Sequence, residues 1–321
     1  MTLVDSSPPD AEAPSEQSFD QPISRLGDKV FSGISFSAAA LILLTLAAVA
    51  TFLIVQGFPT FTAPEDEFNQ SFLEYVGPFV FGTIYASALA LLMATPVAVA
   101  VALFISHYAP KRLAQTLGYF IDLLAAVPSV VFGIWGIEVL APILSRSVYP
   151  WLEDNMSFLP FFGPTASTSG RTLLTGAIVL AVMILPIIVA ISREVFSQTP
   201  RLHEEASLAL GATRWEMIRQ AVIPYGRSGV ISGAMLGLGR ALGETMAVAI
   251  IVSGSSGYFW NVITNQNSNT IAANIALSFP ESSGLAVNRL IASGLVLFAI
   301  TFGVNAIARK VASAGFSGAD G

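Results

Sequence analysis

This chain contains a series of long apolar segments with few or no charged residues. Six of them occur, at residues 30–56, 79–105, 113–144, 172–192, 228–252 and 290–308. Each is near or above the roughly 20 residues that an α-helix needs to cross the hydrocarbon core of a bilayer. We therefore predict an all-α polytopic membrane protein with six transmembrane helices.

The composition agrees with a chain that lies mostly in lipid. Of the 321 residues, 54% are hydrophobic and 11% are charged, whereas a soluble domain carries about 25% charged residues. Cysteine is absent, which excludes disulfides and thiolate metal sites. The two histidines, His107 and His203, have no further metal ligands beside them, and no Gly-x-x-x-x-Gly-Lys motif occurs. We therefore expect no metal site, no bound cofactor, no catalytic residue and no nucleic-acid partner.

The distribution of lysine and arginine predicts the orientation, because these residues resist translocation. If the N-terminus lies in the cytoplasm, eleven of the fifteen Lys and Arg residues fall on the inner side and three on the outer side. Arg240 is left within the membrane. Both termini are therefore expected to be cytoplasmic, in the bacterial cell membrane.

The chain is expected to divide into four parts along its length. Residues 1–28 contain acidic residues, proline and serine, and are predicted to be a disordered tail. Residues 29–77 hold the first transmembrane helix and an outer loop, and residues 78–308 form one membrane domain. Residues 309–321 are expected to be a cytoplasmic tail.

The outer connections contain clusters of aromatic residues, such as Tyr258, Phe259 and Trp260. Aromatic residues at this level form an interfacial belt in many membrane proteins. A second interpretation, contact with an external partner, stays open.

One inner connection, residues 193–227, is long for a bundle loop and carries signals of structure. A proline follows Thr199 as at the first turn of a helix, residues 202–210 follow, and Gly211 fits a left-handed stop. Thr213 and Glu216 have the spacing of a capping box at the start of another helix, which Pro224 is expected to close. We predict two short cytoplasmic helices, at about residues 200–223, that form a docking element.

This element resembles the cytoplasmic signature of the membrane subunits of ABC importers. The signature is Glu-Ala-Ala, three residues, Gly, nine residues and Ile-x-Leu-Pro, and here Glu205, Ala206, Gly211 and Pro224 keep its spacing. Ser207 replaces the second alanine. The resemblance implies that the segment docks into a groove on a separate ATPase subunit, which binds ATP and Mg²⁺.

Two further segments resemble one branch of this family, the phosphate-importer permeases of the PstC type. These segments are residues 237–248, Gly-Leu-Gly-Arg-Ala-Leu-Gly-Glu-Thr-Met-Ala-Val, and residues 127–133, Val-Pro-Ser-Val-Val-Phe-Gly. Permeases for sulfate and molybdate carry a related Arg-Ala-Leu-Gly-Glu that usually continues differently, so Thr245 and Met246 favour phosphate.

The resemblance has implications for the fold and for the partners. It implies the MetI-like type I importer fold, in which the first helix wraps a five-helix core. The implied partners are a paralogous second permease (PstA type), an ATPase dimer (PstB type), an extracytoplasmic phosphate-binding protein (PstS type) and the lipid bilayer.

Arg240 and Glu244 are the candidate residues of a substrate pathway. If the fifth helix begins near Ser228, Arg240 lies about 18 Å into the membrane. A central arginine costs about 2.5–3.5 kcal/mol on insertion scales, so it should face a partner or an aqueous path. Its planar fork matches a phosphate oxyanion. Four residues apart on one helix, Arg240 and Glu244 could instead form a purely structural ion pair.

Three residues of the predicted third helix are further candidates for the pathway or for helix packing: Asp122, Pro128 and Ser129. An acid inside a span is a functional candidate, and pairing within the bundle is the alternative role of Asp122. Proline at positions 96, 128 and 186 is expected to kink its helix.

Other classes of function are less compatible with the sequence. An intramembrane protease would need a Ser–His or paired-Asp constellation within the spans, whereas His107 lies at a membrane edge and Asp122 is the one aspartate within them. A sensor or scaffold without transport would not need the docking element. The alternative that stays open is a permease for another oxyanion, such as sulfate or molybdate.

Overall fold

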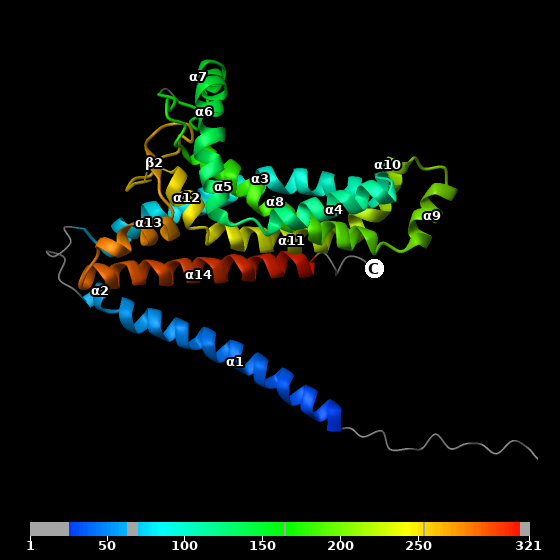
Figure 1. Ribbon diagram of the computed structural model, residues 1–321, viewed down its shortest axis with the longest axis horizontal. Coiled ribbons are helices and arrows are strands. Elements are labelled where there is room, and N and C mark those ends of the chain that lie inside the picture. The colour runs from blue at the N-terminus through cyan, green and yellow to red at the C-terminus, as the bar shows by residue number, and fades with distance from the viewer. Residues whose placement is uncertain (1–25, 63–69, 164, 253, 315–321) are drawn as a thin grey trace, which may run out of the picture. The chain divides into compact units, whose positions relative to one another are not determined.

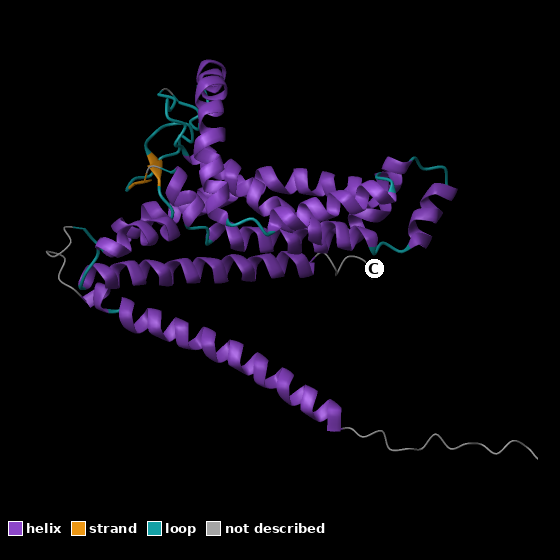
Figure 2. Cartoon of the chain, in the orientation of Figure 1, coloured by secondary structure: helices purple, strands orange, loops and turns teal. Residues whose placement is uncertain are grey.

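The computed structural model describes residues 26–62, 70–163, 165–252 and 254–314, and Figure 1 shows the order of their helices. Within these residues the chain is helical apart from loops and one pair of two-residue strands (Figure 2). The chain divides into two units, residues 1–50 and 51–321, and each is described by itself. Most of the predicted N-terminal tail, residues 1–25, lies outside the described residues.

Helix α1, Leu26–Gly57, occupies the described part of the first unit and ends in the second. It begins three residues before the predicted boundary at residue 29. After Lys29 it contains no charged residue and has no polar face. Such a helix is suited to a lipid or protein environment on every side.

Five helical stretches among the described residues are long and apolar enough to cross a membrane: Gly27–Thr62, Phe72–Tyr108, Ser129–Met156, Leu173–Ser197 and Leu285–Ile307. Four of them correspond to predicted segments one, two, four and six. Predicted segments three and five are each interrupted, which remains compatible with six crossings.

The third predicted segment, residues 113–144, is divided by Pro128. Helix α4, Lys111–Ala125, ends before this proline, and α5, Ser129–Trp135, begins after it. Proline lacks an N–H and disfavours helical backbone in the residue before it, so it starts a new helix here where a kink was predicted. The helix then continues through α6, Ala141–Ile143, to α7, Tyr149–Met156, with π-helical turns at residues 136–140 and 144–148.

The fifth predicted segment, residues 228–252, is also two helices. Helix α11, Ile223–Leu242, ends at Gly243, and α12, Met246–Ile251, follows. At its start, α11 continues from α10, Arg214–Met217, through a π-helical turn at residues 218–222. The prediction that Pro224 closes a docking helix is therefore wrong. Proline is tolerated in the first turn of a helix, where Pro224 lies.

The core of the second unit is the contact between α3, Phe72–Leu103, and α8, Leu173–Ser197, which is the most extensive between any two described elements. The buried face of α3 consists of alanines four residues apart, each at most 2% exposed: Ala86, Ala90, Ala94, Ala98 and Ala102. They share one cluster with Leu180, Ile184 and Ile188 of α8. Small residues let two helix backbones approach closely, as in many membrane bundles.

Helix α11 packs on α8 through glycine. A Cβ added to Gly233 or Gly237 would lie 3.2 Å from side-chain atoms of Ile191 or Ile188, respectively, so these glycines allow close approach. Gly233 and Gly237 form a Gly-x-x-x-Gly pair, a spacing that allows close helix packing in membranes. The second pair, Gly239 and Gly243, does not pack in this way, because Gly239 faces open space and Gly243 ends the helix.

The two ends of the second unit carry different elements (Figure 1). Helix α9, Arg201–Ala209, and α10 lie at one end. At the other lie α2, Pro59–Thr62, α13, Ile271–Ser278, and a short 3-10 turn, Phe279–Glu281. Here β1, Gly254–Ser255, pairs in parallel with β2, Asn267–Ser268. Helix α14, Leu285–Ala314, runs beside α11 and extends six residues into the predicted C-terminal tail.

The alanine face of α3 should be sensitive to added volume. We expect Ala98→Leu to lower the free energy of unfolding by about 1–3 kcal/mol, because the extra atoms have no space against the core. The matched control is Ala100→Leu, on the exposed face of the same helix, which should have little effect. Thermal unfolding of the purified chain in detergent measures both, and equal destabilisation by the two variants would contradict this account of the core.

Candidate functional site

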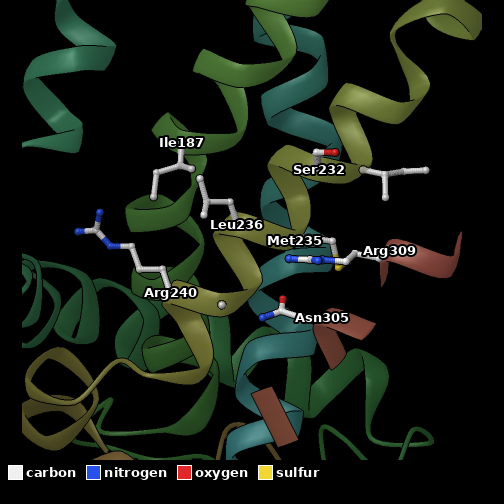
Figure 3. A pocket seen from close by; sticks show the side chains of 9 residues that line it. Ile187, Ser232, Met235, Leu236, Arg240, Asn305 and Arg309 are labelled. Carbon is white, nitrogen blue, oxygen red and sulfur yellow. The ribbon is translucent and has the colours of Figure 1, made fainter. Parts of the chain in front are cut away.

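A groove of about 630 Å³ lies between α8, α11 and α14. Its lining side chains are mostly apolar, with two arginines, one serine and one asparagine (Figure 3). The nine lining residues are Ile187, Ile231, Ser232, Met235, Leu236, Gly239, Arg240, Asn305 and Arg309. They include no acidic residue, so the charge of the groove lining is positive.

Arg240 enters this groove from the last turn of α11, where it is partly buried. Figure 3 shows its side chain on one side of α11, with Asn305 and Arg309 on the other. Within the described residues one salt bridge occurs, between His107 and Glu204. Arg240 therefore holds its positive charge in the groove without an acidic partner in this part of the chain.

The sequence suggested that Glu244 and Arg240 share one face of a continuous helix, but in the structure they do not. Because α11 ends at Leu242, the four-residue spacing does not place the two side chains on one helical face. Glu244 is 8% exposed, and its Oε1 accepts a hydrogen bond from the backbone N–H of Ala247 at 3.0 Å. The carboxylate thus satisfies a free N–H group at the start of α12.

The other predicted candidates of this region do not line the groove. Asp122 is exposed near the end of α4. Pro128 precedes α5 and Ser129 begins it. Helix α5 contacts α12, and a Cβ on Gly133 would lie 3.0 Å from the Cα of Ala247. Pro128 and Ser129 therefore position the helix that supports α12.

The predicted docking element has the expected local structure at its centre. Gly211 has a φ of +88°, in the left-handed region, and directly follows the end of α9. Glu205 and Ala206 are exposed on α9. Pro200, not Thr199, is the residue before the first helical one.

The predicted capping box at the start of α10 is confirmed. The Thr213 side chain accepts a hydrogen bond from the Glu216 N–H, and the Glu216 carboxylate accepts one from the Thr213 N–H at 2.7 Å. The hydrogen bonds from Thr213 hold the pKa of the Glu216 carboxyl below its usual value. The conformation of the turn between α9 and α10 is thus stabilised by Gly211 at its start and by the Thr213–Glu216 capping box at its end.

A contact between α9 and the end of α3 was not predicted from the sequence. The Nε2 atom of His107, in a π-helical turn at the end of α3, lies 3.5 Å from Oε1 of Glu204. On the other side of the same ring, Nδ1 lies 2.7 Å from the Ser106 hydroxyl. Because the partners are about 100 residues apart in sequence, spacing gave no signal of this contact.

A buried polar loop at the opposite end was also missed. Four consecutive residues of this loop are at most 4% exposed: Asn267, Ser268, Asn269 and Thr270. The Asn267 carboxamide accepts from Leu173 N–H at 2.8 Å and donates to Arg171 C=O at 3.0 Å. The Ile271 N–H donates to the Thr83 hydroxyl of α3 at 2.9 Å. This asparagine-rich stretch therefore closes this end of the bundle through hydrogen bonds.

Comparison with known families places the chain in a class of transport proteins. The family model described as "Binding-protein-dependent transport system inner membrane component" matches residues 94–313. The match covers more than half of the chain, so the chain belongs to this family of membrane permeases.

The relatives in sequence are permeases of one transport system. The chain is 41% identical over 308 residues to "Phosphate transport system permease protein PstC 2" of Mycobacterium tuberculosis, covering 92% of this chain and 94% of the relative. It is 46% identical over 220 residues to the PstC protein of Mycobacterium leprae, covering 67% and 68%. The PstC protein of Mesorhizobium japonicum is 41% identical over 213 residues, with 64% of each chain covered.

Solved structures support the same fold. A bacterial ABC transporter involved in the import of the acidic polysaccharide alginate aligns with a TM-score of 0.56 and 16% identity, covering 88% of this chain and 99% of that one. The MetNI methionine ABC transporter aligns with a TM-score of 0.52 and 14% identity, covering 76% and 95%. The predicted MetI-like fold of a type I importer is therefore confirmed.

Proposed function

We propose that this chain is the permease subunit that carries inorganic phosphate through an ATP-driven importer. The observation that carries the proposal is the partly buried arginine, Arg240, in a groove whose lining contains no acid. An oxyanion that crosses a bilayer needs a cationic donor to offset its loss of hydration. The relatives described above are phosphate transport permeases, which favours phosphate over sulfate or molybdate.

The chain is proposed to act in a complex with three kinds of partner. A PstA-type permease would complete the pathway, a PstB-type ATPase dimer would bind ATP and Mg²⁺, and a PstS-type protein would deliver phosphate from outside. This chain itself is a transport component and not an enzyme. The known fold supports the general arrangement, since the structural neighbours are ABC transporters.

The proposed contact with the ATPase is α9, with Glu205 and Ala206 on its exposed surface. A movement of α9 would be transmitted to α3 through the contact between Glu204 and His107. It would reach α11 through Gly211 and the capped start of α10, because α10 and α11 are continuous. With α9 and α10 on the cytoplasmic side, both termini would be cytoplasmic as well.

The left-handed turn at Gly211 should be needed for coupling. We expect Gly211→Val to impair assembly with the ATPase or uptake, because a β-branched residue is strained at a φ of +88° by about 1–3 kcal/mol. A Cβ there meets no atom within 4 Å, so the effect would come from the backbone alone. Gly211→Asn is the matched control, since asparagine tolerates this conformation. Full assembly and a normal uptake rate in Gly211→Val would end the coupling role.

Arg240 should be required for passage of the anion. We expect Arg240→Gln to lower phosphate uptake at least roughly tenfold, since a charge-assisted hydrogen bond contributes about 1.5–3 kcal/mol. Arg240→Lys keeps the charge and loses the planar fork, so it should retain part of the activity. The measurement is initial uptake into proteoliposomes, normalised to the amount of assembled complex.

Two control variants distinguish an effect on phosphate passage from an effect on folding. Arg227→Gln, on the exposed face near the start of α11, should transport normally. Glu244→Gln keeps an oxygen that can accept from Ala247 N–H, so the complex should assemble and any change should appear in transport kinetics. Normal uptake in Arg240→Gln, or failure of Glu244→Gln to assemble, would contradict this account of the pair.

A further inference from the structure

The groove contains a second cationic side chain, Arg309, which has no part in the function proposed for Arg240. Arg309 and Asn305 lie four residues apart on α14 and therefore share one face of that helix. Figure 3 shows the Arg309 guanidinium extending across Met235 of α11, next to the Asn305 carboxamide. Two polar side chains from one helix thus lie beside the surface of another.

The chemistry of this pair matches a tetrahedral oxyanion. A guanidinium offers five N–H donors in a planar fork, and a carboxamide adds two more. Ser232, opposite them on α11, donates its own hydroxyl proton to the Ser228 carbonyl at 2.9 Å. Besides Arg240, the side chains of the groove with donors available for an anion are therefore Arg309 and Asn305, and no acid among the lining residues competes for them.

A comparison with Lys310 separates Arg309 from basic residues whose role is to fix the orientation of the chain in the membrane. Lysine and arginine at the inner end of a span fix the orientation of the chain, and they extend toward water. Lys310 is exposed and is not among the residues that line the groove, whereas Arg309 is. A residue that only fixes the orientation would need neither a groove nor a carboxamide beside it.

We propose that Arg309 and Asn305 form a second phosphate-binding site, from which the ion leaves for the cytoplasm. The proposal rests on the proposed transport of phosphate and adds a site to it. Arg240 would bind the ion on one side of α11, and Arg309 would receive it on the other. Arg309 and Asn305 are exposed in this chain, so they would hold the ion from one side only, which would keep binding weak enough for release.

A release site predicts inhibition from the inner side, because product phosphate would occupy it. The complete transporter is reconstituted in vesicles that contain ATP and graded unlabelled phosphate, with binding protein and labelled phosphate outside. The quantity measured is the internal phosphate concentration that halves the initial uptake rate. We expect Arg309→Gln to raise it about tenfold and Asn305→Ala to raise it less. Lys310→Gln is the matched control and should leave it unchanged.

The lipid composition of the vesicles distinguishes free phosphate from a lipid headgroup, which carries the same chemical group. The effect of Arg309→Gln should be equal in phosphatidylcholine vesicles with and without phosphatidylglycerol. An effect that appears only with phosphatidylglycerol would overturn the proposal, because the groove would then bind a lipid.

The remaining outcomes separate this proposal from the proposed function. Equal inhibition in the unaltered, Arg309→Gln and Lys310→Gln complexes would overturn the second site, since any inhibition would then arise at the ATPase. If Arg240→Gln abolishes uptake in the same experiment, the transport pathway stands although the second site fails. If Arg240→Gln transports normally, the proposed function itself fails.

Discussion

The structure depends on the close contact between α3 and α8. In a bilayer, burial of apolar surface does not by itself bring helices together, so association relies on packing at short range. The alanines at every fourth position of α3 supply that packing on one side of α8. The glycines of α11 supply it on another side, against Ile188 and Ile191. Helix α8 is therefore the fixed element that positions α11, and α11 carries the candidate residue Arg240.

The break after α11 determines what the charged residues of this helix can do. A continuous helix would have placed Glu244 on the face of Arg240, where the two charges would largely cancel. The end at Gly243 turns Glu244 to the start of α12, where its carboxylate accepts a backbone N–H. Arg240 is then left as a cation in an apolar groove. This arrangement favours binding an anion over a structural ion pair, because the favourable charge interaction stays available to a ligand.

Local signals in the sequence predicted much of the fold. Long apolar runs predicted the uninterrupted spans, and the spacing of Thr213 and Glu216 predicted the capping box. The predictions made for two prolines were wrong. Pro128 starts a helix where a kink was expected, and Pro224 lies inside a first turn where a helix end was expected. The pairing of His107 with Glu204 and the groove between α11 and α14 depend on distant parts of the chain, so periodicity could not reveal them.

This chain is expected to carry phosphate as part of an ATP-driven importer. The most direct test is uptake of labelled phosphate by vesicles that hold the complete complex, with the binding protein outside and excess sulfate or molybdate as competitor. We expect uptake that requires ATP inside the vesicles and is unchanged by either competitor. Accumulation of sulfate or molybdate in preference to phosphate, or uptake that does not need ATP, would contradict it.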